Sequence, residues 1–405
     1  MTGPNGNVTV NAPSKLTNRA FISNQYSGNL QIVDTQNDTT AYYTATNNNT
    51  GNTTPGGAPA SAVAIQLAGS STLMALRPDD AETVVFQPTA NVLNFVTNSS
   101  ETSSGTVTLP GYTNALVYSP DSTKLYVPVP NAPVQNPGTP VTYGKPGAVA
   151  IITEATSTVA VGLTSLVPVP AAQNVAITSD GKTLLVFAAN SDTMYLIDLT
   201  ATNPAAVAIP GFARPVNAFF SSDNTTAYVL NCGPECGSSA GPPSVMRFNM
   251  ASQTVTATVP VGGASVGLLK GTTLYVAGSP GGSTGTFDVV DVSAMNRTTV
   301  NPVAIGDGTH TLMAVSNNNK LYIGAATCAN QTVGCLSIVD LGKVALDTVS
   351  QPLGAVTGLQ SIPGRNTMYA VEGGYLFIYD TNTGQLQSTQ LAFRGALYAV
   401  VQVDP

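Results

Sequence analysis

Charged residues are scarce in this sequence. Only 9% of its 405 residues are Asp, Glu, Lys or Arg, well below the roughly 25% of ordinary soluble domains. The 14 basic residues are thinly spread and are outnumbered by 21 acidic ones. Nucleic-acid binding needs clustered Lys and Arg, so we expect no nucleic-acid partner.

Long apolar runs are also missing. None approaches the roughly 20 residues of a membrane-spanning helix, so we predict no transmembrane segment. Residues 1–14 are rich in Asn, Gly and Pro and do not show the charged and apolar regions of a signal peptide. We expect residues 1–14 to be an N-terminal linker or extension and residues 15–405 to form the folded domain.

Histidine occurs once, as His310, which excludes any catalytic arrangement of two imidazoles. The sequence has no nucleophile-elbow motif, phosphate-binding loop or metal-binding helix motif. We therefore predict no catalytic residue, no metal site and no cofactor. Enzymatic activity is less well supported than binding.

What the sequence does contain is typical of β-structure. Thr, Ser, Asn and Gly replace the missing charged residues, and they suit strands and turns better than helices. Hydrophobic residues make up 43%, enough for a substantial core. The predicted class is all-β.

The four cysteines form two close pairs, Cys232 with Cys236 and Cys328 with Cys335. Such local pairs predict two disulfides and an oxidising compartment, with each short loop contributing about 2–3 kcal/mol. The alternative is a four-thiolate zinc site. The spacings do not match a zinc knuckle, and the pairs lie in different repeats, so disulfides are favoured.

An internal repeat organises nearly the whole chain. A short strand with a central aromatic or apolar residue recurs eight times, mostly at steps of 41–47 residues. Its centres are Phe21, Val85, Tyr126, Leu185, Tyr228, Tyr275, Tyr322 and Tyr369. A third strand then ends in Asp, at Asp34, Asp198, Asp291, Asp340 and Asp380. We interpret these carboxylates as openers of the next turn rather than as an acidic site.

Segments such as RAFISNQYSGNLQIVDT (19–35) and SPDSTKLYV (119–127) resemble the YVTN-type repeats of lactonase-like β-propellers. The resemblance covers roughly residues 15–405. It implies a β-propeller of four-stranded antiparallel blades, and it says little about function because fold and function are separable.

Eight second strands predict eight blades, with seven as the alternative if the unit at Phe21 or Val85 is not a true blade. The first unit has no inner strand, whereas a surplus strand follows the last unit at 394–403. We therefore predict that the C-terminal strand completes the N-terminal blade. Such closure removes open sheet edges.

In propellers of this kind, the loops joining second to third strands share a face with the connections between blades. The long insertions fall mostly on that face, at 45–60, 129–147, 231–244, 278–285 and 325–335. We expect a binding surface there, and the alternative is neutral variation of loops that tolerate insertions. Arg214, His310 and Arg394 each lie close to the start of an inner strand. Two interpretations are open: an anion site that rings the channel mouth, or isolated surface side chains, of which the second is favoured.

These features favour a secreted or cell-surface, non-enzymatic propeller that acts as a binding or structural module, with the periplasm as the other oxidising location. Its expected partners are a protein or glycan at the cell surface, or copies of itself. Self-assembly would use NVTV (7–10) as a strand added to a neighbour's sheet. The alternative is a lactonase-like hydrolase with its site at the central channel.

Overall fold

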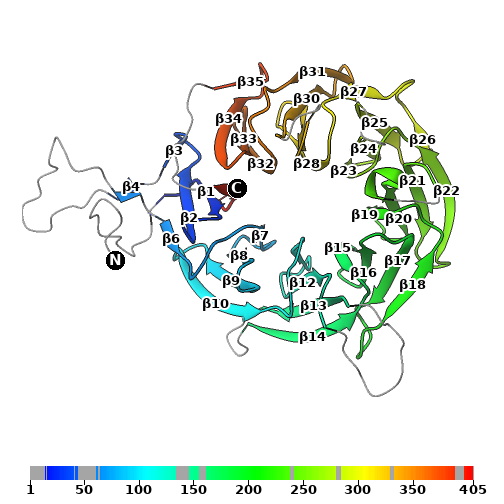
Figure 1. Ribbon diagram of the computed structural model, residues 1–405, viewed down its shortest axis with the longest axis horizontal. Coiled ribbons are helices and arrows are strands. Elements are labelled where there is room, and N and C mark those ends of the chain that lie inside the picture. The colour runs from blue at the N-terminus through cyan, green and yellow to red at the C-terminus, as the bar shows by residue number, and fades with distance from the viewer. Residues whose placement is uncertain are drawn as a thin grey trace, which may run out of the picture.

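The computed structural model describes residues 14, 16–40, 42–43, 61–62, 64–133, 146–154, 161–237, 241–279, 284–328, 333–387 and 396–404. In it, eight antiparallel sheets surround a common centre and form a β-propeller (Figure 1). The eight-blade prediction is confirmed, because the units at Phe21 and Val85 both form complete sheets.

Each blade runs from an innermost strand at the channel to an outermost strand at the rim. Blade 1 contains, from the inside outward, β36 (Leu397–Gln402), β1 (Arg19–Asn24), β2 (Asn29–Asp34) and β3 (Thr39–Thr40), and β6 (Ala64–Gln66) also pairs with β2. Blade 2 contains β7 (Met74–Leu76), β8 (Glu82–Gln87), β9 (Val92–Thr97) and β10 (Thr102–Thr108). Blade 3 contains β11 (Val117–Tyr118), β12 (Lys124–Val129), β13 (Ala148–Thr153) and β14 (Gly162–Pro168). Blade 4 contains β15 (Ala172–Ile177), β16 (Thr183–Ala188), β17 (Thr193–Asp198) and β18 (Ala206–Pro210).

The remaining blades follow the same order. Blade 5 contains β19 (Pro215–Phe220), β20 (Thr226–Asn231), β21 (Ser244–Asn249) and β22 (Thr254–Pro260). Blade 6 contains β23 (Val266–Lys270), β24 (Thr273–Gly278), β25 (Gly285–Asp291) and β26 (Asn296–Arg297), and β27 (Val303–Ile305) also pairs with β25. Blade 7 contains β28 (His310–Val315), β29 (Lys320–Ala325), β30 (Leu336–Asp340) and β31 (Ala345–Val349). Blade 8 contains β32 (Val356–Ile362), β33 (Thr367–Glu372), β34 (Tyr375–Asp380) and β35 (Gln385–Leu386).

Outside the blades, β4 (Tyr42–Tyr43) pairs with β5 (Ser61–Ala62), and η1 (Gly233–Cys236) is a single 3-10 turn. Within the described residues, no helix is long and apolar enough to cross a membrane.

The second strand of each blade is buried because it lies between neighbouring sheets. Every residue of β1 and β8 is buried, whereas the outermost strand β22 begins with three exposed residues. The repeated aromatic fills the space between blades: Tyr126 of β12 packs with Val175 and Val186 of blade 4. The repeat therefore reflects one packing position used around the ring.

The C-terminal strand closes the ring, as predicted. Strand β36 pairs with β1 in antiparallel register, with Phe21 opposite Val401. Next to this pairing, Arg19 donates hydrogen bonds of 2.7 and 2.8 Å to the Asp404 carboxylate. The first and last parts of the chain thus share one sheet (Figure 1).

The aspartates that end the third strands act as turn openers, which confirms their interpretation. Each accepts a hydrogen bond from the backbone N–H two residues ahead, at 2.8–2.9 Å. These acceptors are Asp34, Asp198, Asp291, Asp340 and Asp380.

We call the face that carries the second-to-third-strand loops and the blade connections the loop face. The insertions 129–147, 231–244, 278–285 and 325–335 join second to third strands and leave from this face. The insertion 45–60 differs, because its flanking strands β3 and β6 both pair with β2 at the outer edge of blade 1. Residues 45–60 themselves, and the NVTV segment at 7–10, lie outside the described residues.

Candidate functional site

A cavity of about 680 Å³ opens on the loop face at the inner ends of blades 3 to 7. Four amide side chains, three hydroxyl groups, one guanidinium and one imidazole contribute to its lining. The innermost strands β15, β19 and β28 each supply residues from their first positions, so the cavity lies where the channel meets the loop face.

β-Bulges shape this part of the innermost strands. Pairing shifts by one residue at Gln173 in β15, at Val216 in β19 and at Thr311 in β28, and all three residues line the cavity. A bulge redirects a side chain and bends its strand, and bulges are over-represented beside functional sites. The side-chain amide of Asn174 then bridges two blades by donating a 2.9 Å hydrogen bond to the carbonyl of Val216.

Arg214 enters the cavity from the connection between blades 4 and 5. Its φ of 56° is in the left-handed region, which costs a residue with a Cβ about 1–2 kcal/mol. Two backbone hydrogen bonds hold it there: its N–H donates to Oδ1 of Asp192 at 3.0 Å, and its carbonyl accepts from Cys232 N at 2.9 Å. Its Nε lies 3.8 Å from the same Asp192 oxygen, so this carboxylate partly balances the guanidinium charge.

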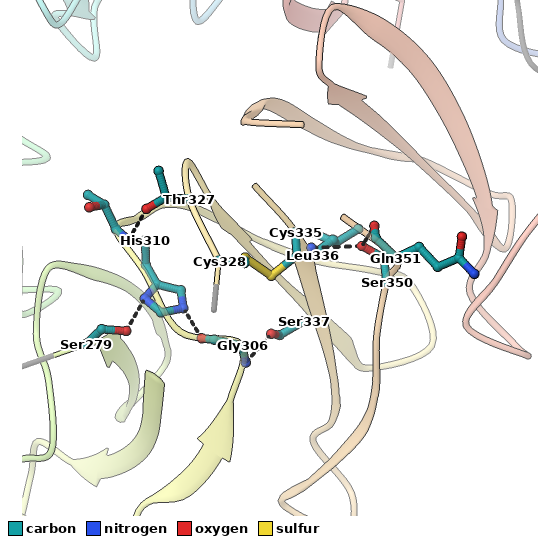
Figure 2. Close-up of a disulfide and its surroundings, with 11 residues drawn as sticks. Ser279, Gly306, His310, Thr327, Cys328, Cys335, Leu336, Ser337, Ser350 and Gln351 are labelled. Atoms are coloured by element: carbon teal, nitrogen blue, oxygen red, sulfur yellow. Dashed lines mark hydrogen bonds between the residues drawn. A yellow bond between two sulfur atoms is a disulfide. The ribbon is translucent and has the colours of Figure 1, made fainter. Parts of the chain in front are cut away.

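His310 begins β28 and is 3% exposed. Its Nε2 donates a 2.9 Å hydrogen bond to the carbonyl of Gly306, and its Nδ1 lies 3.5 Å from the Ser279 hydroxyl (Figure 2). Because burial disfavours the charged ring, the pKa of His310 is lowered to about 4. The imidazole is therefore uncharged at neutral pH.

The structure brings together two of the three residues of the candidate anion site at the channel mouth. Arg214 and His310 line the same cavity, although they belong to different blades. Arg394 lies outside the described residues. Arg214 alone of these two carries charge, so the character of an anion site would depend on its guanidinium.

Both predicted disulfides are present. Cys232 is bonded to Cys236 and Cys328 to Cys335, with Cα–Cα distances of 5.7 and 5.9 Å. The first encloses η1, and Cys236 lines the cavity. A zinc site built from these four thiolates is thereby excluded.

The first disulfide loop contains a bracing residue, Glu235, that sequence analysis missed. Oε2 of Glu235 accepts a 2.8 Å hydrogen bond from the backbone N–H of Ser279 in blade 6, and burial raises the pKa of Glu235. The Ser279 hydroxyl in turn approaches His310 of blade 7. Three consecutive blades are thus joined beside the cavity. Only the position of Glu235 between two paired cysteines signalled it in advance.

The second disulfide supports the other side of His310 (Figure 2). Ser337, two residues after Cys335, accepts a 2.9 Å hydrogen bond at Oγ from the N–H of Gly306. A Cβ added to Gly306 would come within 2.8 Å of Cys335 Sγ. Gly306 is therefore packed against the disulfide while its carbonyl holds the imidazole.

Exposed aromatic side chains also gather on the loop face, which the sequence analysis did not predict. Tyr26, Tyr112 and Tyr375 are 79%, 42% and 47% exposed. Tyr26 lies between β1 and β2, Tyr112 between blades 2 and 3, and Tyr375 at the start of β34, so all three belong to this face. Within the described part of the chain, the exposed apolar residues on the outermost strands are aliphatic. The sequence feature that could have identified these exposed aromatics is a tyrosine at a loop position.

A second cluster lies on the opposite face, between blades 2 and 3. Arg77 is 3.8 Å from a carboxylate oxygen of both Glu82 and Glu154, and both side chains are almost fully buried. Burial first, and the neighbouring Glu82 second, raise the pKa of Glu154 to about 8. This cluster joins two blades away from the cavity.

Carboxylates are absent from the strands that form the described channel wall. The innermost strands β7, β11, β15, β19, β23, β28, β32 and β36 contain no Asp or Glu. Among the residues that the structure describes, no group of three His, Cys, Asp or Glu side chains is placed to hold a metal ion.

No protein-family model matches this sequence, and no curated protein matches it. Among solved structures, the fold is similar to that of the dihydro-heme d1 dehydrogenase NirN in complex with DHE, at 11% identity and a TM-score of 0.68, over 98% of this chain and 76% of that one. It is also similar to a functionally unknown protein from Desulfotomaculum acetoxidans DSM 771, at 12% identity and a TM-score of 0.51, over 95% and 98% of the two chains. The β-propeller domain of Cps50 (Swd1) from Myceliophteria thermophila matches at 9% identity and a TM-score of 0.53, over 75% and 92%. At these identities the likenesses support the fold alone, a β-propeller, and the number of blades comes from the eight sheets described above.

Proposed function

We propose that this protein is a secreted or cell-surface binding module, not an enzyme, and that its partner docks on the loop face. One observation carries the proposal: the cavity, the exposed tyrosines and both disulfides occur together on that face. Tyrosine with Asn, Ser and Gly on a rigid scaffold is the composition that antibody combining sites use for recognition.

Two further features support the location and the origin of the module. Disulfides persist in oxidising compartments, which favours a position outside the cytosol. The repeated KLYV-like second strands and the Asp that ends the third strand support descent from YVTN-type repeats. The lactonase-like alternative gains no support from the channel, because the innermost strands lack carboxylates.

Binding of the fluorescently labelled propeller to intact cells of its source tests the proposal. A triple variant, Tyr26→Ser with Tyr112→Ser and Tyr375→Ser, removes the exposed aromatics of the loop face. A matched control, Leu163→Ser with Val207→Ser, changes exposed apolar residues on the outermost strands β14 and β18. We expect the control to bind as the native protein does and the triple variant to lose at least about tenfold in affinity.

Equal binding by all three proteins would contradict a binding role for the loop face. Hydrolysis of simple lactones above the uncatalysed rate, dependent on added divalent cation, would instead favour the enzyme.

A further inference from the structure

Resting on the proposed function, we infer that the cavity at the channel mouth binds an uncharged polyhydroxylated ligand, that is, a neutral oligosaccharide. The inference follows from the hydrogen-bonding groups of the cavity, from its charge and from an exposed tyrosine two residues away from it in the chain.

The first observation is the set of hydrogen-bonding groups that line the cavity. Gln173, Asn114, Thr309 and Thr311 line the cavity and are exposed to solvent. Amides and hydroxyls each contain donors and acceptors, as the hydroxyl groups of a sugar do. Gln173 of blade 4 and Thr311 of blade 7 both lie at bulges and line the cavity, three blades apart around the channel. The cavity therefore offers complementary partners from several directions.

The second observation is the charge of the side chains that line the cavity. The His310 ring is neutral, since its pKa is lowered to about 4. The Arg214 guanidinium has the Asp192 carboxylate 3.8 Å away, so part of its charge is balanced locally. Among the described lining residues, an anionic ligand would meet this one partly balanced guanidinium, whereas an uncharged ligand needs no counter-charge in the cavity. The low charge of the whole chain, 9%, agrees with this.

An exposed aromatic residue also lies close to the cavity in the chain. Tyr112 is two residues before the cavity residue Asn114, in the connection between blades 2 and 3, and its ring is half-exposed. Phe86 contacts this ring edge-on, with ring centroids 5.5 Å apart. A ring held in place by its neighbour loses little freedom when a ligand binds. Sugars present an apolar C–H face beside their hydroxyls, and an exposed tyrosine with adjacent amides matches both parts.

The size of the cavity, about 680 Å³, is that of a site for a small molecule or for a few sugar units rather than for a folded protein. Tyr26 and Tyr375 lie further round the same face, on blades 1 and 8, where a longer chain could extend.

The test is titration calorimetry with defined oligosaccharides. The neutral probes are cellohexaose, maltohexaose, mannohexaose and chitohexaose in its N-acetylated form, and the acidic probe is trigalacturonate. Each is measured at about 50 mM and about 500 mM NaCl, because screening weakens only charge-dependent binding. The variants are Gln173→Leu and Tyr112→Ala, with Leu163→Ser on β14 as the matched control.

We expect at least one neutral probe to bind equally at both salt concentrations. Gln173→Leu and Tyr112→Ala should each weaken that binding about tenfold or more, and Leu163→Ser should leave it unchanged. Thermal unfolding of the variants near the native midpoint confirms that the exposed substitutions leave the fold intact.

Binding of trigalacturonate alone, weakened by salt and by Arg214→Gln, would overturn the inference in favour of the anion site. So would unchanged binding by both cavity variants, or no binding of any neutral probe by a propeller that still labels cells through its loop face. In that last case the proposed function stands and the ligand class is wrong. If the triple tyrosine variant bound cells as tightly as the native protein, the proposed function itself would be wrong.

Discussion

The backbone N–H of Ser279 donates a 2.8 Å hydrogen bond to Oε2 of Glu235, and this contact crosses from blade 6 to blade 5. Glu235 can reach Ser279 because the Cys232–Cys236 disulfide closes η1 into a tight loop. A side chain on a disulfide-closed turn thus braces the next blade beside the cavity.

This bracing predicts unequal effects of two substitutions at Glu235. Glu235→Ala leaves the buried N–H of Ser279 without its acceptor, and we expect it to lower the free energy of unfolding by about 1–3 kcal/mol. Glu235→Gln keeps an acceptor oxygen and needs no ionised group in a buried site, so it should cost less. Urea unfolding at pH 7 measures both. A larger loss for Gln than for Ala would contradict this role of the carboxylate.

Removal of the Cys232–Cys236 disulfide is expected to lower the free energy of unfolding modestly. Replacing Cys232 and Cys236 by Ser opens a loop with a sequence separation of 4, for which the chain-entropy model gives about 2 kcal/mol. The expected change is a small drop in unfolding midpoint together with weaker ligand binding, because Cys236 lines the cavity. Calorimetric unfolding and binding on one preparation check both parts. A propeller that binds normally without this bond would show that the bond acts on stability alone.

The buried pair Glu82 and Glu154 predicts a pH dependence of stability. In the folded protein the pKa of Glu154 is raised to about 8 from an ordinary 4.5, so the folded state binds the proton more tightly. Its contribution is fully present below pH 4.5 and is lost as the pH rises through about 8. Glu372, whose pKa burial raises to about 7, acts in the same direction.

The variant Glu154→Gln isolates that contribution. An amide cannot ionise, so its stability should fall less between pH 5 and pH 9 and should exceed that of the native protein at pH 9 by on the order of 1 kcal/mol. Chemical unfolding across this range provides the measurement. Parallel pH profiles for the two proteins would rule out Glu154 as the titrating group.

The titration of His310 predicts the opposite trend: stability is lost as the pH falls. Its pKa is lowered from 6.5 to about 4, so the unfolded chain takes up the proton first. The stability that its neutral form contributes is present above pH 6.5 and is lost as the pH falls through about 4. His310→Gln should flatten the profile between pH 6.5 and pH 4, and His310 proton resonances followed by NMR give the pKa directly. An ordinary pKa near 6.5 would contradict the buried, neutral ring.

Ring closure predicts that the C-terminal residues are essential. Removing residues 396–405 deletes β36, leaves β1 with an open edge and removes the Asp404 partner of Arg19. We expect the truncated chain to unfold or aggregate. Asp404→Asn, which keeps the strand but weakens the ion pair, should cost about 1–3 kcal/mol. A truncated chain with native circular dichroism and unfolding would disprove closure by this strand.

The sequence alone determined the architecture, because propeller packing requires the same residue types at regular intervals along the chain. Each second strand buries a large residue such as Tyr126 or Tyr322 between sheets, and an Asp at the end of a third strand, such as Asp340, opens a turn. Local cysteine pairs likewise required no distant partner, so Cys232–Cys236 could be predicted from spacing.

Only the tertiary structure decided the site. Arg214 and His310 are far apart in sequence, and their shared cavity depends on how blades 4 to 7 meet at the channel. The neutral state of His310 and the raised pKa of Glu154 depend on burial, which has no counterpart in residue spacing. Exposed tyrosines such as Tyr26 look like core tyrosines in sequence, because a tyrosine's exposure is fixed by the strands around it. Periodic packing can be recognised along a chain, whereas a site made from the ends of separate blades exists only once the ring has closed.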